Sequence, residues 1–243
     1  METQNFNSFQ DPMDVQNVSS EVMAKTFTAR VFSWMFVGLG VTAVISYLFA
    51  SVPNLRDALF TSTGASPLFY VALFAPFALV LLMGMAMQRL SYPAMIGVFL
   101  LYSGLMGVSL STIFLVYQLG SIFTVFLIAA GMFGAMAVVG YTTHTDLTKF
   151  GSLMIMLLVG VIIASLVNMF IHSSSFDYMI SFLCVAIFTG LTAYDVQKIK
   201  RIGGQINADG STTGKMAIWG ALSLYLDFIN LFLALLRIFG RRR

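Results

Sequence analysis

Two aspartates in the last third of the chain have the residue type and spacing for chemistry inside a membrane. Asp227 lies near the middle of the apolar run 222–240, and Asp195 ends the apolar part of the preceding segment, FTGLTAYDVQKIK. One aspartate at the centre of a spanning helix costs about 2.5 to 3.5 kcal/mol, so two in neighbouring segments suggest a pair. Two carboxylates that meet in a poorly solvated site do not both ionise easily and titrate as one coupled unit. The predicted chemistry is therefore reversible proton binding.

Asp227 belongs to a stripe of polar and small residues on one face of the last predicted helix. Its members recur at intervals of three and four residues and are Gly220, Ser223, Asp227, Asn230, Ala234 and Arg237. Nearly all other side chains of this segment are Leu, Phe, Ile, Tyr or Trp. Because lipid offers polar groups no partner, we expect the stripe to face the bundle interior or a water-filled cavity.

Each charged residue of this group also has a structural interpretation. Asp195 is followed by Lys198 and further cations, so it could be a solvated helix end. Asp227 could make a structural hydrogen bond across the core. Arg237 could extend its stem along the helix to reach lipid headgroups.

The elements that must position these residues are membrane-spanning helices. With 58% hydrophobic and 9% charged residues and a mean hydropathy of +0.89, the chain has too few charges to cover a soluble globule. Seven apolar stretches are long enough to cross a hydrocarbon layer of about 30 Å. They are residues 31–50, 68–86, 93–117, 121–141, 152–171, 178–194 and 217–239. The predicted fold is an all-α polytopic membrane protein with seven transmembrane helices.

Outside the spans the sequence predicts little. Residues 1–29 form a polar N-terminal tail with an expected interfacial helix, 30–240 one seven-helix domain, and 241–243 a basic tail. The tail lacks a basic region before a short apolar core, so we expect an uncleaved first span.

The lone Cys184 is interpreted as a small buried residue. Most cations flank spans, so the net charge of +3 does not indicate nucleic-acid binding.

The distribution of these cations predicts a cytoplasmic N-terminus but contains a conflict. Eight lie on the side of the N-terminus: Lys25, Arg30, Arg89, Lys149, Lys198, Lys200, Arg201 and Lys215. Five lie on the other side: Arg56, Arg237 and residues 241–243. A hairpin in the last segment would bring the basic tail inside, but no Gly or Pro interrupts its middle. We therefore expect seven full spans.

Three smaller features have structural interpretations. Small residues at fourfold spacing, such as Thr42 with Ser46 and Gly131 with Ala135, predict close helix packing. In the sequence YTTHTDLTKF, a histidine and an aspartate offer only two metal ligands, and TDLTK is better explained as a cap for the next helix. The sequence NADGST is interpreted as a turn.

The chain resembles the Bax-inhibitor family of membrane proteins in its bacterial form. The matching sequences are YSGLMGVSLSTIF (102–114), GYTTHTDLTKFGS (140–152), NMF (168–170), LTAYDVQKIK (191–200) and ALSLYLDFINLFLALLRIFG (221–240). They extend from the third span to the end of the chain, and the last two are specific when they occur together in this order.

The resemblance implies a function and a site. Characterised members are similar in being pH-sensitive calcium leaks, with the last helix central and an aspartate pair that here corresponds to Asp195 and Asp227. Ionised, the pair offers four hard oxygens that suit transient calcium binding, and with a shared proton it forms a closed latch. The family's latch arginine has only Arg89 as a candidate here, in a loop where it could equally be an orientation charge. Arg237 corresponds to the arginine of the family's LLR sequence, and Ser223 and Asn230 extend the stripe.

The implied role is a calcium or cation leak in the bacterial inner membrane, serving ion homeostasis or stress protection. No enzyme activity and no cofactor are expected, and calcium is the permeant ion. Two alternatives remain. Some bacterial relatives restrain a membrane-bound protease through their N-terminal tail, and Met1–Ser20 is compatible with such a partner role. A remote alternative is an intramembrane aspartyl protease, although the sequence LYLD lacks the glycines that open the backbone at such sites.

Overall fold

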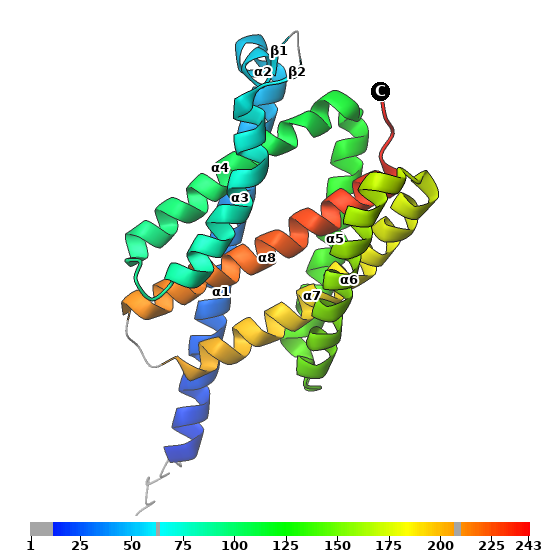
Figure 1. Ribbon diagram of the computed structural model, residues 1–243. Coiled ribbons are helices and arrows are strands. Elements are labelled where there is room, and N and C mark those ends of the chain that lie inside the picture. The colour runs from blue at the N-terminus through cyan, green and yellow to red at the C-terminus, as the bar shows by residue number, and fades with distance from the viewer. Residues whose placement is uncertain (1–11, 62–63, 207–209) are drawn as a thin grey trace, which may run out of the picture.

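The computed structural model describes residues 12–61, 64–206 and 210–243. Its helices are α1 (Pro12–Ser51), α2 (Pro53–Leu59), α3 (Pro67–Ala86), α4 (Tyr92–Val116), α5 (Leu119–Thr142), α6 (Thr148–Ile171), α7 (Ser174–Gln205) and α8 (Gly210–Phe239). Two short strands, β1 (Phe60–Thr61) and β2 (Gly64–Ala65), pair as an antiparallel hairpin. All of these helices except α2 are long and apolar enough to cross a membrane (Figure 1). The predicted all-α polytopic fold with seven spans is confirmed.

The ends of the chain differ in detail from the sequence-based expectation. α1 is one continuous helix from Pro12, so the expected interfacial segment before the first span is the start of α1 itself. α2 and the β1–β2 hairpin were not predicted, because the sequence between the first two predicted spans has no clear hydrophobic period. Residues 1–11 of the predicted tail, and residues 207–209 of the predicted NADGST turn, lie outside the described residues.

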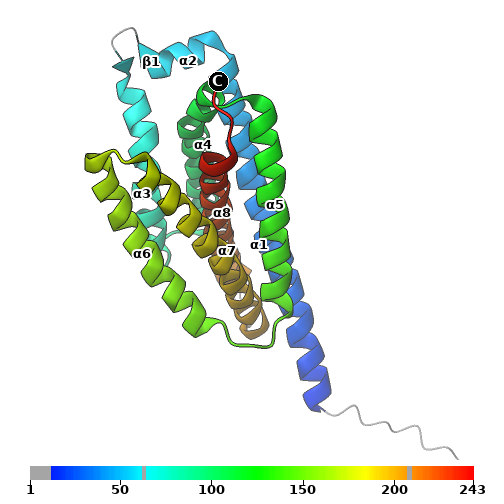
Figure 2. The same cartoon turned by 90° about the vertical axis from the view of Figure 1, so that its right-hand side faces the viewer.

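α8 occupies the centre of the bundle, as predicted. It packs against α1, α4, α5 and α7, and Figure 2 shows it enclosed by these helices. It is one uninterrupted helix of 30 residues, or about 45 Å, which excludes a hairpin in the last segment. α3 packs chiefly against α4, and α6 against α7. The side of α8 that faces α3 and α6 is therefore packed less tightly, and we call it the loosely covered face of α8.

Small residues allow the closest helix contacts, but only some of the predicted ones. A side chain at Gly107 of α4 would meet the Thr42 carbonyl of α1 at 2.8 Å, so this α1–α4 contact requires glycine. Around Gly131 of α5 there is open space, and Ala135 is exposed, so this predicted packing row is wrong. The tight contact of α5 is instead made by Gly140, which lies against the α7 backbone.

A buried hydrogen-bond chain ties α8 to α1 and α4. The Thr42 hydroxyl donates to the Ser103 carbonyl at 2.8 Å, and Thr42 Oγ1 lies 2.7 Å from the Tyr225 hydroxyl. Because the single hydroxyl proton of Thr42 is used by Ser103, Tyr225 must donate to Thr42. These bonds fix the rotation of α8 two residues before Asp227.

The C-terminal residues are held in place at the far end of α8. The Gln118 N–H donates to the Arg241 carbonyl at 3.0 Å, and the Arg243 N–H donates to the Val116 carbonyl at 2.9 Å. The predicted basic tail is thus fastened by its backbone to the α4–α5 connection, and its three side chains are exposed.

Candidate functional site

A cavity of about 550 Å³ lies beside the loosely covered face of α8, bounded by α3, α6, α7 and α8. Along α8 it extends from Trp219 to Arg237, a rise of about 27 Å, which is close to the thickness of a hydrocarbon layer. α3 and α6 contribute mainly apolar side chains to its wall. The polar lining comes chiefly from α7 and α8 and comprises Ser165, Ser181, Tyr194, Asp195, Lys198, Ser223, Asp227, Asn230 and Arg237.

The two predicted acids meet in this cavity. Asp227 is 5% exposed, and its Oδ2 atom is buried without a hydrogen-bond partner in the described part of the chain. Asp195 is half-buried, receives a hydrogen bond from the Ser223 side chain, and is attracted by Lys198. Both carboxylates line the same cavity, and the negative charge of Asp195 acts on Asp227.

No other helix brings a compensating charge to the acid pair. α4 and α5 contain no Asp, Glu, Lys or Arg, and α1 has none after Arg30. The remaining charged groups of the cavity are Lys198 and Arg237 at its two ends. The site therefore consists of two acids at mid-depth between two cations.

Most other residues of the predicted stripe line the cavity, and one packs against α1 instead. Ser223, Asn230 and Arg237 line the cavity, and Ala234 does so as well. The Asn230 Nδ2 group donates to the Leu226 carbonyl of its own helix at 2.8 Å, so its amide oxygen is the atom left for the cavity. Gly220 instead packs against Val31 of α1 and does not reach the cavity.

Arg89 lies away from the acid pair. It belongs to the turn between α3 and α4, its side chain is exposed, and it does not line the cavity. The same turn is held by Lys215 of α8, whose Nζ donates to the carbonyls of Met87 and Leu90 at 3.3 and 3.2 Å. In this conformation Arg89 is placed as a charge at the membrane border.

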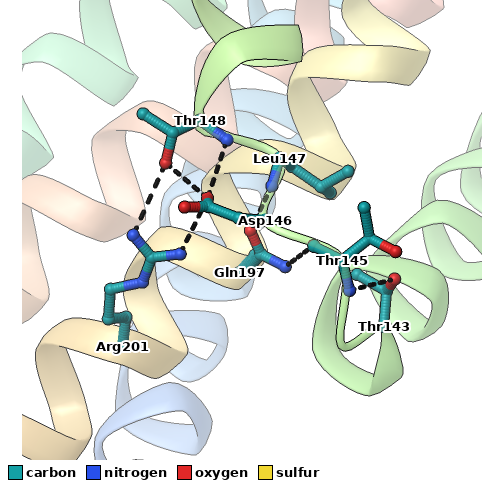
Figure 3. A network of polar contacts seen from close by, with 7 residues as sticks. All are labelled: Thr143, Thr145, Asp146, Leu147, Thr148, Gln197 and Arg201. Atoms are coloured by element: carbon teal, nitrogen blue, oxygen red, sulfur yellow. Dashed lines mark hydrogen bonds and ion pairs between the residues drawn. The ribbon is translucent and has the colours of Figure 1, made fainter.

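The α5–α6 loop is bound to the end of α7 just beyond Asp195, as Figure 3 shows. Gln197 accepts a hydrogen bond from the Leu147 N–H at 2.8 Å and donates to the Thr145 carbonyl at 2.7 Å. Asp146 Oδ1 lies 3.0 Å from Arg201 Nη2. The loop thereby fixes the last turns of α7, on which Asp195 sits.

Asp146 binds the first residue of α6 from the position before the N-cap residue, Leu147, so the predicted cap is present one residue early. Its Oδ1 atom accepts hydrogen bonds from the N–H of Thr148 at 3.0 Å and from the Thr148 hydroxyl at 2.6 Å. These bonds, together with the nearby Arg201 guanidinium, hold the pKa of Asp146 well below its usual value. The neighbouring His144 is exposed. Within the described ranges no group of three or more His, Cys, Asp or Glu side chains lies close enough together to hold a metal ion.

Several lining residues were not found from the sequence. Trp219, which packs against Gly84 of α3, closes the cavity at the end that also carries Lys198. Phe77, Ile155 and Ile162 form its apolar wall on α3 and α6. No polar pattern distinguishes these residues from lipid-facing ones, because both helices are predominantly apolar.

The fold and the cavity define a class of protein: a seven-helix integral membrane protein with an acid pair buried beside its central helix. Residues 24–243 match the family described as "Inhibitor of apoptosis-promoting Bax1", and the chain belongs to this Bax-inhibitor family. The resemblance noted in the sequence is confirmed.

Relatives extend over almost the whole chain. The chain is 46% identical to the Inner membrane protein YbhL of Escherichia coli (strain K12) over 221 residues, covering 90% of this chain and 93% of that protein. It is 46% identical over 232 residues to an uncharacterized protein of Borreliella burgdorferi, covering 95% and 99%. An uncharacterized membrane protein of Streptococcus pyogenes serotype M1 is 38% identical over 222 residues, covering 91% and 95%. Two of these names describe a membrane protein, which agrees with the seven apolar helices of this chain.

Proposed function

We propose that the protein is a pH-sensitive leak for calcium or other cations, controlled by Asp195 and Asp227. The observation that carries this proposal is that both acids line one cavity at mid-depth of the bundle, where Asp227 Oδ2 lacks a hydrogen-bond partner among the described residues. A carboxylate left without partners in a membrane indicates an ion or proton pathway more often than a structural role.

The oxygen atoms around the pair suit a hard cation. When both acids are ionised, their four oxygens can replace part of the hydration shell of calcium, assisted by the Ser223 hydroxyl and the Asn230 amide oxygen. Two acids bind weakly enough for a cation to leave again, as conduction requires. Calcium is thus the permeant ion in this proposal and not a resident cofactor.

A proton shared by Asp195 and Asp227 controls the passage of cations in this proposal. When the pair holds one proton, its charge falls and the two carboxyl groups can hydrogen-bond to each other, which joins α7 to α8. The charges that face the pair are those of Lys198 and Arg237, and α1, α4 and α5 add none within the membrane. The pH dependence therefore belongs mainly to the pair. Arg89 is given no latch role, because it lies outside the cavity.

The alternatives have less support from the site. Asp195 and Asp227 lie in uninterrupted helices, so no opened backbone offers a place for a peptide substrate. A partner role for Met1–Ser20 depends on a segment of which residues 1–11 lie outside the described part of the chain. We also propose that the N-terminus is cytoplasmic, because eight of the thirteen Lys and Arg residues lie on its side of the bundle.

The test is calcium entry into dye-loaded liposomes that contain the purified protein, measured across a pH series. Wild type is compared with Asp195→Asn and Asp227→Asn, and Asp57→Asn serves as a control because Asp57 is an exposed acid outside the spans. The proposal predicts a pH-dependent leak whose midpoint is shifted or abolished by either cavity variant and unchanged in the control. Liposomes that remain tight at every pH, with correctly folded protein, would refute it.

A further inference from the structure

We infer that the cavity is also a binding site for amphipathic amines, which enter sideways from the lipid between α3 and α6. The inferred ligand has a primary ammonium head, bound by Asp227 and Asp195, and an apolar tail that leaves the protein toward the hydrocarbon layer. This inference does not depend on calcium passage, because it concerns equilibrium binding from the bilayer.

The cavity opens toward the lipid between α3 and α6. Phe77 of α3 and Ile155 and Ile162 of α6 line the cavity, yet they are 70%, 47% and 51% exposed. Side chains that face both the cavity and the outside mark the rim of an opening. Since α3 packs on α4 and α6 on α7, this rim lies at membrane depth between two helix pairs (Figure 2).

The two routes to the acids, along the bundle axis and sideways between α3 and α6, differ in charge. Along the bundle axis, Lys198 stands at one end of the cavity and Arg237 at the other, and both repel an approaching organic cation. The sideways route carries only apolar side chains from α3 and α6, apart from Ser165. A ligand with an apolar tail follows this route without leaving the hydrocarbon layer.

One carboxylate oxygen in the cavity can still accept hydrogen bonds. Asp227 Oδ2 is buried and has no partner among the described residues, whereas Asp195 already receives a hydrogen bond from Ser223. An ammonium group has three N–H donors and supplies the missing partner, while its positive charge offsets the two acids. A neutral or anionic head offers no such compensation.

The cavity is also large enough for such a ligand. A volume of about 550 Å³ is within the range of small-molecule sites and holds a head group with the first part of an alkyl chain. The wall around the acids is formed by apolar residues such as Leu158, Leu226 and Leu233. Such a lining offers apolar contacts to the methylene groups of a tail.

Trp219 provides a direct readout, because it lines the cavity and the chain has only one other tryptophan, Trp34. In a Trp34→Phe background in lipid nanodiscs, Trp219 fluorescence is titrated with a nitroxide-labelled long-chain primary amine. The same nitroxide-labelled chain with an alcohol head measures simple partitioning into the bilayer. The expected result is saturable quenching by the amine and weak, linear quenching by the alcohol.

Two variants test the route and the acid separately. Asp227→Asn is expected to weaken amine binding by at least about tenfold, because it removes a buried charged partner. Ile162→Phe narrows the opening and is expected to slow or weaken quenching. Ile163→Phe is the matched control, since Ile163 is exposed on the same helix and does not line the cavity.

The inference is wrong if amine and alcohol quench alike, or if Asp227→Asn leaves the amine curve unchanged. It is also wrong if Ile162→Phe and Ile163→Phe behave the same way. Because the assay reads fluorescence and not flux, a protein that leaks calcium without binding the amine would contradict this inference alone. A protein that binds the amine without leaking would contradict the leak alone.

Discussion

Replacing Thr42 by valine is expected to destabilise the bundle more than replacing Tyr225 by phenylalanine. The Thr42 hydroxyl both donates to the Ser103 carbonyl and accepts from Tyr225, so its loss removes two hydrogen bonds and leaves the buried Tyr225 hydroxyl unpaired. An unpaired buried polar group costs about 1 to 3 kcal/mol. Tyr225→Phe removes only one bond, and the ring keeps its edge contacts with Phe99 and Tyr102. Its expected cost is about 0.6 kcal/mol, the average for such bonds in a membrane protein, and no more than about 1.7 kcal/mol.

The assay is reversible unfolding of the purified protein in mixed micelles by increasing denaturing detergent. The double variant is included, so that the coupling between Thr42 and Tyr225 is obtained directly. Tyr47→Phe is the control, because Tyr47 is 54% exposed and its hydroxyl has no hydrogen bond in the described structure. A Tyr225→Phe cost larger than that of Thr42→Val, or a coupling of zero, would refute the two hydrogen bonds assigned to the Thr42 hydroxyl.

Three further predictions concern packing, pH and charge. Gly140→Val should lower the unfolding free energy by about 1 to 3 kcal/mol or prevent folding, because its side chain would overlap the α7 backbone, whereas Gly131→Val should be tolerated in the same unfolding assay. Asp146 has a lowered pKa, so its bonds stabilise the fold fully above the usual value of 3.8 and are lost as the pH falls toward the lowered one. The melting temperature of wild type should therefore drop more steeply below about pH 4 than that of Asp146→Asn. Arg237→Gln should raise cation entry into liposomes by roughly tenfold, because it removes a positive charge at one cavity end, and Arg89→Gln should not.

The polar stripe was predictable because one helix carries it. In α8 the polar and small residues recur with the helical period against an apolar background, so the sequence indicates a single face. Four members besides Asp227 line the cavity, and only Gly220 turned out to serve helix packing. The meeting of Asp195 with Asp227 was likewise expected, since each needs a partner away from lipid.

The cavity itself could not be predicted, because it depends on how whole helices pack. α3 and α6 are predominantly apolar, so no pattern in either sequence shows which face lines the cavity. The Gln197 contacts with the α5–α6 loop join residues about 50 positions apart, and no local pattern reports such a contact. Gly131 and Gly140 look alike in the sequence, and only the position of α7 decides which of them must remain glycine.

We infer that Asp195 and Asp227 bind protons as one unit that controls cation passage. Infrared titration of the protonated carboxyl band in lipid, alongside calcium flux from the same samples, tests this coupling most directly. We expect that removing either acid changes the titration of the other, and that the wild-type carboxyl and flux midpoints coincide. Titrations that are the same in the single variants as in wild type, or a flux midpoint unrelated to the carboxyl band, would contradict it.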